Sequence, residues 1–303
     1  MNDDTDFDRF LGRAWNEHAD DAPGVASRLP QAVAAVTHAA QAERLAALIV
    51  HVHGEHLGRW HDGLATLDAL SRRLQALPTE AAVDRAAAEA ALQRQGAALR
   101  LAAGDPNALQ GLASDAAIAA RAVVAGIAAG RDDWPTAIAH WRRALADAAP
   151  GLPDGSPALR ALAVTGNNLA AALEERASRS ADETAAMLEA AAAGLSYWSR
   201  AGGWTEVERA HHRLGSCRLA AADAPGAAAS ARACLALCAE HDAPAFERFF
   251  GEALLARASH AAATRDAATI EEGMAAATRA RALAATLGAD ERAWCDAELA
   301  RLP

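Results

Sequence analysis

Apolar and small residues recur along the chain at helical spacing, and short breaks separate the segments that carry them. The segment 210–237 shows the pattern most clearly, because Ala227, Ala231 and Cys234 follow one another at intervals of four and three. The preceding break, ADAPG at 222–226, places a proline where a helix can begin. The pattern predicts two antiparallel helices. One such pair cannot bury its apolar stripe alone, whereas a stack of pairs can.

The same pattern predicts helices along nearly the whole chain. An irregular helical cap is expected over residues 1–39, and a last helix is expected to cover the end of the stack. After the cap, the main predicted helices, the last one included, are 43–57, 60–77, 79–103, 116–129, 134–149, 158–176, 184–200, 204–222, 226–240, 244–262, 267–287 and 289–302.

The strongest break in the chain is the segment PGLPDGSP at 150–157. It separates an N-terminal set of helices, 40–150, from a C-terminal set, 151–303. The break could divide two subdomains, but eight residues also fit a loop between repeats. The second interpretation is favoured, and it predicts one continuous α-solenoid.

A series of aromatic, small and large apolar residues occurs twice with gaps of three, four and three. Its members are Trp60, Gly63, Leu67 and Leu70 in the first copy and Trp134, Ala137, Trp141 and Ala144 in the second. The two leading tryptophans are 74 residues apart, about two periods of a unit of roughly 34–37 residues. Over about 40–287 the chain resembles the tetratricopeptide repeat.

Three glycines resemble the small residue of the first helix in that family, namely Gly166, Gly215 and Gly251. The resemblance implies an all-α, right-handed solenoid of antiparallel helix pairs. Gly166 and Gly215 are 49 residues apart, which predicts an enlarged turn at 177–183. Because no unit carries the whole family pattern, a related irregular α-solenoid stays open.

Composition narrows the classes of partner. All 29 basic residues are arginines, and the net charge of −10 argues against non-specific binding to nucleic acid or to an anionic membrane. The most apolar run, 122–129, is far shorter than the ~20 residues of a membrane span. The first residues, MNDDTDFD, are acidic, unlike a secretory signal. The four cysteines form no CxxC pair, which favours reduced thiols in a cytoplasmic protein.

Histidines cluster in the segment HVHGEH at 51–56, with His61 following after a short turn. Imidazoles are suitable ligands for zinc and other transition metals. At 100° per residue, however, His53 and His56 share a helical face and His51 points elsewhere, paired with Glu55. We therefore expect His51, His53, His56 and His61 not to converge, and we expect the protein to hold no metal.

No arrangement of catalytic residues or cofactor motif stands out. Gly202 and Gly203 precede a helix but lack the strand and the spacing of a nucleotide-binding loop. Cys217, Cys234 and Cys238 could join a histidine at a metal site, but small thiols in a tight helix crossing explain them better. These observations predict a protein without a cofactor that is not an enzyme.

The resemblance implies a binding groove. In tetratricopeptide proteins the first helix of each pair lines the concave surface, and matched positions in this chain are Arg160, Asn167, Arg209, His212, Ser216, Arg248 and Glu252. Asn167 resembles the groove asparagine of peptide-binding members. Ala163 stands where the carboxylate-clamp subtype carries lysine, which puts that chemistry in doubt. Alternatively, the same polar side chains only solvate an exposed helical face.

The leading hypothesis is a scaffold that binds a protein or peptide, acidic or bearing a carboxylate, because arginine can bind a carboxylate in bidentate fashion. His212 is expected to strengthen that binding as the pH falls toward 6. The first alternative is a regulatory protein that responds to a peptide or small ligand. The second is a metal-binding protein or an enzyme that uses the cluster between His51 and Asp62. The oligomeric state does not follow from the sequence.

Overall fold

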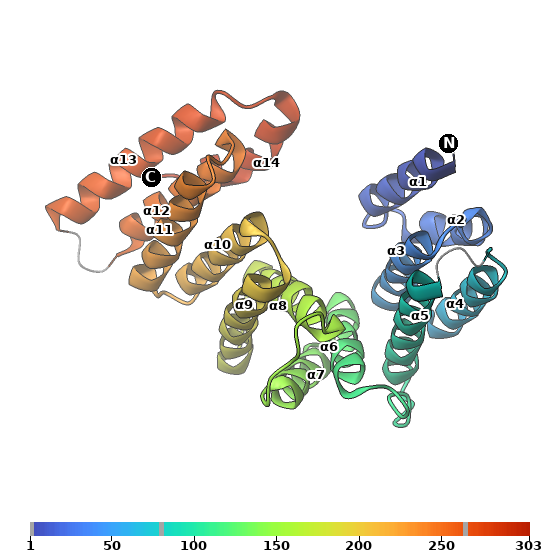
Figure 1. Cartoon of the computed structure of the whole chain (residues 1–303). Helices are drawn as coiled ribbons and strands as arrows, with labels where there is room; N and C mark the ends of the chain where they lie inside the picture. The colour runs from blue at the N-terminus through green and yellow to red at the C-terminus, as the bar shows by residue number, and fades with distance from the viewer. Residues whose placement is uncertain (1–2, 79–81, 263–265) are drawn as a thin grey trace. The chain divides into compact units, whose positions relative to one another are not determined.

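The computed structural model describes residues 3–78, 82–262 and 266–303, with the side chains of 3–5, 82 and 83 left aside. These residues form fourteen α-helices and one π-helix, with no strand among them (Figure 1). The elements are α1 (Asp3–Glu17), α2 (Ala22–Ala35), α3 (Ala39–Val50), η1 (His51–His56), α4 (Trp60–Gln75), α5 (Ala82–Ala102), α6 (Ser114–Gly130), α7 (Trp134–Ala148), α8 (Pro157–Glu175), α9 (Ala181–Ala201), α10 (Trp204–Ala220), α11 (Ala224–Glu240), α12 (Ala245–Ala261), α13 (Ala267–Ala284) and α14 (Ala289–Leu299).

Helices adjacent in the chain pack against each other, notably α6 with α7, α10 with α11 and α12 with α13. The prediction of an all-α protein built from packed helix pairs is therefore confirmed. No helix in the described part of the chain is both long enough and apolar enough to cross a membrane.

The chain divides into two compact units, residues 1–161 and 162–303, and the division falls within α8. The segment 150–156 lies before this division and forms a loop that ends where α8 begins. Gly151 and Gly155 adopt positive φ angles of 107° and 79° in this loop, a conformation that glycine adopts without steric cost.

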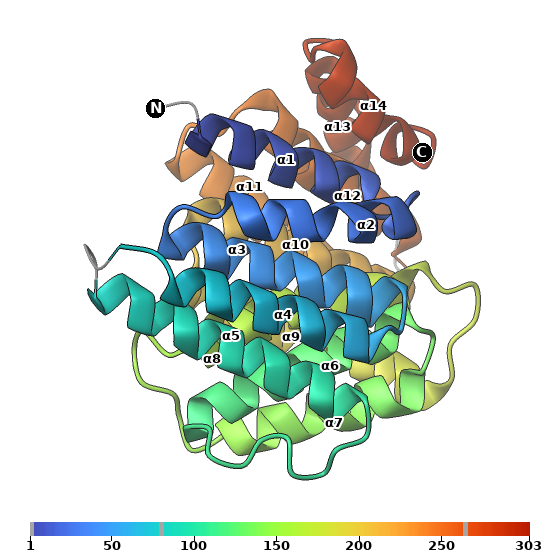
Figure 2. The ribbon, with the colours of Figure 1, turned by 90° about the vertical axis from the view of Figure 1, so that its right-hand side faces the viewer.

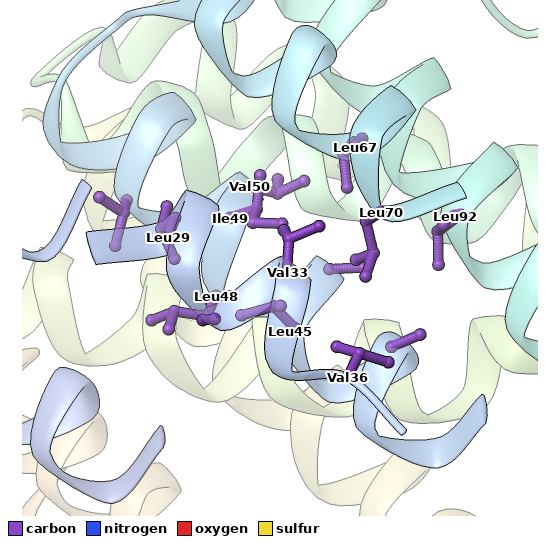
Figure 3. Close-up of a cluster of buried hydrophobic side chains, with 14 of the residues drawn as sticks. Leu29, Val33, Val36, Leu45, Leu48, Ile49, Val50, Leu67, Leu70 and Leu92 are labelled. Carbon is purple, nitrogen blue, oxygen red and sulfur yellow. The ribbon is translucent and has the colours of Figure 1, made fainter. Parts of the chain in front are cut away.

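In the first unit, successive helices from α1 to α5 lie side by side (Figure 2). Their apolar faces meet in one core, in which Leu29 and Val33 of α2 lie beside Leu45 and Ile49 of α3 and Leu70 of α4 (Figure 3). Leu29 and Val33 are four residues apart, as are Leu45 and Ile49, which places each pair on one face of its helix. The N-terminal helix α1 adds Phe7 and Leu11 to the same core.

The helix predicted at 43–57 consists of two parts, because α3 continues directly into the π-helix η1. The amide of Leu57 donates to the carbonyl of Val52 at 3.1 Å, which is the i→i+5 pattern of a π-helix. Gly58 then turns the chain with a φ of 61°. Wider helical turns change which side chains share a face, and this matters for the histidines of η1.

Aspartates cap helices that begin with proline. The side chain of Asp223 accepts a hydrogen bond from the amide of Gly226 at 2.9 Å, and Asp133 caps α7 in the same way through Thr136. Pro225 occupies the first turn of α11. The break predicted at 222–226 therefore lies where the sequence indicates.

Helices in the second unit approach closely at glycines, and Figure 1 shows α10, α11 and α12 packed together. A methyl group added to Gly215 would lie 2.5 Å from Leu254 Cδ2 and 2.9 Å from Ser230 Cβ. A methyl group on Gly251 would lie 3.0 Å from Leu235 Cδ2. The prediction that Gly215 lies at a close helix crossing is confirmed.

Candidate functional site

Three arginine–glutamate pairs join helices α8, α10, α12 and α14. Arg213 of α10 binds Glu174 of α8 at 2.5 Å. Arg209 donates from Nε and Nη2 to Glu247 of α12, at 3.2 and 2.5 Å. The third pair is Arg257 of α12 with Glu298 of α14, at 2.5 Å.

The residues of these pairs are separated in the sequence by 39, 38 and 41 positions, respectively. A nearly constant separation is what a helical repeat produces when equivalent helices lie next to each other. The pairs therefore mark where the helices of the second unit stack.

Aromatic rings lie between the ion pairs. The ring of His212 packs edge-on against Phe250, with centroids 5.6 Å apart, and Phe246 continues the row at 5.1 Å from Phe250. We call the set of paired and aromatic side chains the first-helix strip, and its members are Glu174, Arg209, His212, Arg213, Phe246, Glu247, Phe250, Arg257 and Glu298.

His212 is held neutral within this strip. Its Nε2 atom is buried and has no hydrogen-bond partner among the described residues. Burial lowers the pKa of His212 to about 4, and the guanidinium groups of Arg213 and Arg257 act in the same direction. The expectation that His212 strengthens binding of acidic ligands as the pH falls toward 6 is therefore wrong, because the ring stays uncharged at that pH.

Arg209 and His212 lie on the side of α10 that faces α12, but Arg209 is not a free cation. Its side chain is 60% exposed while that of Glu247 is only 9% exposed. The pair fixes the guanidinium in place and neutralises most of its charge locally. Sequence reasoning identified the arginine and missed its carboxylate, which comes from the next helix pair.

Glu252 and Ser216 are buried rather than groove-facing. Glu252 accepts from Arg279 of α13 at 2.6 and 2.8 Å, so it faces the second helix of its own pair. Phe250 of α12 faces α10, and it lies two positions from Glu252, about 200° around the helix. The register carried over from the family pattern does not hold on α12.

The remaining predicted positions lie apart from the strip. Arg248 is exposed two residues from both Phe246 and Phe250, and it forms no ion pair with the described residues. Asn167 is half-buried where α8 crosses α9, and its backbone nitrogen lies 3.1 Å from a methyl group placed on Gly194. Arg160 is exposed on α8 within the first unit.

Two features of the sequence could have located the strip. One is the recurrence of arginine and glutamate at 38–41 positions. The other is the clustering of Phe246, Phe249 and Phe250, three of only five phenylalanines in the chain. The first feature is not visible within a single helix, because it compares residues of different helix pairs.

A buried carboxyl group lies beside the strip. Glu208 of α10 is 1% exposed. Burial raises its pKa to about 8, and the negative charge of Glu247 adds to this effect. Glu208 is therefore protonated in the folded protein at neutral pH.

All four cysteines are free and buried. The thiol of Cys217 donates to the carbonyl of Ala170 at 3.8 Å, and burial raises its pKa to about 12. A protonated, buried thiol is neither a nucleophile nor a metal ligand. The interpretation of these residues as packing groups in tight helix crossings agrees with this environment.

The side chains of two histidines in the segment 51–56 converge, contrary to the prediction. The Nε2 atoms of His51 and His56 lie 3.1 Å apart, and His18 from the end of α1 joins them. His53 is buried against Gly63, and His61 is exposed on α4. The expectation that none of these side chains converge is wrong for His51 and His56, because the π-helix brings residues five apart onto one face.

Comparisons with known proteins place few limits on function. No protein-family model matches the chain, and no curated protein matches it either. Among solved structures it is similar to a chain described as the crystal structure of BtubC (BKLC) from P. vanneervenii. That similarity has 17% sequence identity and a TM-score of 0.47, and it covers 92% of this chain and 91% of the other.

The expectation that the protein is not an enzyme is corrected at this point. It rested only on the absence of recognised catalytic patterns in the sequence, and such an absence does not exclude an enzyme.

Proposed function

We propose that the protein binds a partner polypeptide through the first-helix strip of the second unit, in a tetratricopeptide-like arrangement of helix pairs. The observation that carries the proposal is the row of half-buried rings, His212, Phe250 and Phe246, flanked by the accessible guanidinium of Arg209. Aromatic rings and arginines are the residues that most often dominate binding energy at protein interfaces.

The tetratricopeptide-like part of the proposal is supported by the close crossings at Gly215 and Gly251. Ion pairs spaced at 38–41 residues also support a repeated unit. This spacing is longer than the roughly 34 residues of the tetratricopeptide repeat, so the proposed relative is an irregular member of that class.

Arg209 indicates the chemistry of the ligand. A guanidinium group has five N–H donors, and the pair with Glu247 uses one on Nε and one on Nη2. Three donors are left over from this pair, on a side chain that is 60% exposed. A carboxylate of the ligand can bind these donors while Glu247 keeps the group oriented.

The rings indicate the second part of the ligand. Phe246 and Phe250 are only half-buried, and Phe250 lies against the neutral His212 while Phe246 lies against Phe250. A large apolar or aromatic side chain of the ligand would cover their remaining exposed area. The proposed ligand is therefore a segment that combines a carboxylate with an apolar anchor.

A peptide library displayed on phage and selected with the full-length protein tests the proposal. Enriched sequences should combine Asp, Glu or a free C-terminus with a large apolar residue. They should be lost when the same selection uses Phe246→Ala or Arg209→Gln protein that retains its helical circular dichroism spectrum. Enrichment of the same sequences by the wild type and both variants would show that binding occurs elsewhere.

A further inference from the structure

Three histidines meet in the first unit, and neither the sequence pattern nor any comparison assigns them a role. His18 follows the end of α1, whereas His51 and His56 belong to the π-helix η1. One ring nitrogen of each lies within 4.8 Å of one ring nitrogen of each of the others. The ring centroids are 4.6 to 5.0 Å apart.

The backbone creates this arrangement. In an α-helix, residues five apart differ by about 140° in direction, so His51 and His56 would point away from each other. The i→i+5 pattern of η1 widens the turn and brings these two side chains onto one face. α1 packs against α2 and α3, and this packing delivers His18 to the same face.

Hydrogen bonds prepare two of the rings as ligands. His18 Nδ1 lies 2.7 Å from the carbonyl oxygen of Trp15, which can only accept, so Nδ1 carries the proton. His51 Nδ1 lies 2.6 Å from a carboxylate oxygen of Glu55 and carries its proton for the same reason. In the neutral ring, each Nε2 atom therefore presents a lone pair.

The spacing of the nitrogens fits a tetrahedral metal. The Nε2 atoms of His51 and His56 are 3.1 Å apart. Zinc–nitrogen bonds of about 2.0–2.1 Å at the tetrahedral angle separate two ligand atoms by about 3.3 Å. Without an ion, the Nε2–H of His56 donates to the lone pair of His51 Nε2. In the metal complex the proton of His56 lies on its Nδ1 atom, and both Nε2 atoms bind the ion.

We propose that His18, His51 and His56 form a binding site for one zinc-type transition-metal ion. Imidazole ligands favour Zn²⁺ and its neighbours in the transition series, whereas Ca²⁺ and Mg²⁺ require oxygen ligands. Glu55 orients His51 as a carboxylate–histidine–metal arrangement does, and the carbonyl of Trp15 does the same for His18. Three protein ligands leave a fourth position for water or another small ligand.

The ion joins two elements that are distant in the sequence. It links the end of α1, close to the N-terminus, to η1 in the interior of the first unit. A ligand that binds only the folded arrangement stabilises it in proportion to the logarithm of its concentration. Zinc should therefore raise the melting temperature of the full-length protein.

Titration of the metal-stripped full-length protein with zinc sulfate, in competition with a chromophoric chelator, tests the site. One zinc ion per chain is expected. His18→Ala, His51→Ala and His56→Ala should each weaken zinc binding at least 100-fold, and Glu55→Gln should weaken it 10- to 100-fold. The matched control is His61→Ala, which removes an exposed histidine a few residues further along the chain and should leave zinc affinity unchanged.

A spectroscopic readout does not depend on the stability of the variants. Co²⁺ added to wild-type protein should give the intense visible absorption of a tetrahedral site, and Zn²⁺ should displace it. Zinc should also change the fluorescence of Trp15, whose ring lies 5.0 Å from that of His51, and Trp15→Phe should remove this change. The proposal would be overturned if the wild type bound zinc no more tightly than the triple histidine variant and gave an octahedral Co²⁺ spectrum. These measurements involve no peptide, so their outcome is independent of the proposed function.

Discussion

Glycines determine how closely the helices of the second unit can pack. At Gly215 an added methyl group would overlap Leu254 and Ser230, so Gly215→Ala should destabilise the protein by about 1–3 kcal/mol. The matched control is Gly126→Ala in α6, where nothing lies within 4 Å of the added carbon. That change should stabilise by about 0.5–1 kcal/mol, because alanine favours a helix. Urea denaturation measures both, and equal effects would contradict the close crossing at Gly215.

Glu208 should make stability depend on pH. Its pKa rises from about 4.5 in the unfolded chain to about 8 in the folded protein, so the folded state binds the proton more tightly. The contribution of this proton to the free energy of unfolding is fully present below about pH 4.5 and is lost as the pH rises through about 8. Glu208→Gln should therefore reduce the fall in melting temperature between pH 5 and pH 9.

The control for this measurement is Glu271→Gln, which removes an exposed carboxylate of α13. Its melting temperature should follow that of the wild type across the same pH range. If the melting temperature falls equally between pH 5 and pH 9 in the wild type and in Glu208→Gln, Glu208 is already ionised in the folded protein at pH 5.

At the residue scale, the sequence could predict which small residues pack and could not predict the environment of polar ones. Gly215 is identifiable because its distance in the sequence from Ala227 and Cys234 involves only one helix pair. The pKa of His212 depends on Phe250, Arg257 and Glu298, which come from later helices. The groove-facing position inferred for His212 from one helix alone is therefore half-buried against later helices.

An ion pair contributes to the attachment of α14 to α12, beside the apolar contacts of Cys295 and Leu299. The side chains of Arg257 and Glu298 are 18% and 15% exposed, so Arg257→Ala leaves a poorly solvated carboxylate with only the exposed Arg301 as its partner. This change should cost about 1–3 kcal/mol. Arg232→Ala breaks the exposed pair with Glu272, between α11 and α13, and should cost no more than about 1 kcal/mol. Chemical denaturation of the two variants compares them directly, and equal costs would argue against a role for the pair in attaching α14.

At the element scale, hydrophobic periodicity and helix caps predicted most of the helices. Asp223 and Pro225 marked the start of α11, for example. The π-helix η1 could not be predicted in this way. It shifts the backbone hydrogen bonds by one residue over a few positions, and this leaves the apolar pattern of 43–57 unchanged. The convergence of His51 and His56 was missed for that reason.

At the scale of the whole molecule, the sequence predicted stacked helix pairs but not how neighbouring pairs align. A shift of two residues on α12 separates Phe250, which lies in the first-helix strip, from Glu252, which binds Arg279 of the second helix. Both positions fit the helical period equally well. Only contacts between pairs, such as Arg209 with Glu247, establish the alignment.

The affinity of a selected peptide for two arginine variants tests the proposed binding surface most directly. Arg209→Gln and Arg232→Gln each remove one partner of a two-bond arginine–glutamate pair, the first between α10 and α12 and the second between α11 and α13. Isothermal titration calorimetry should show affinity at least tenfold weaker for Arg209→Gln, a loss of ~1.4 kcal/mol, and no change for Arg232→Gln. Equal affinity of the wild type and Arg209→Gln, or a loss confined to Arg232→Gln, would contradict binding at the first-helix strip.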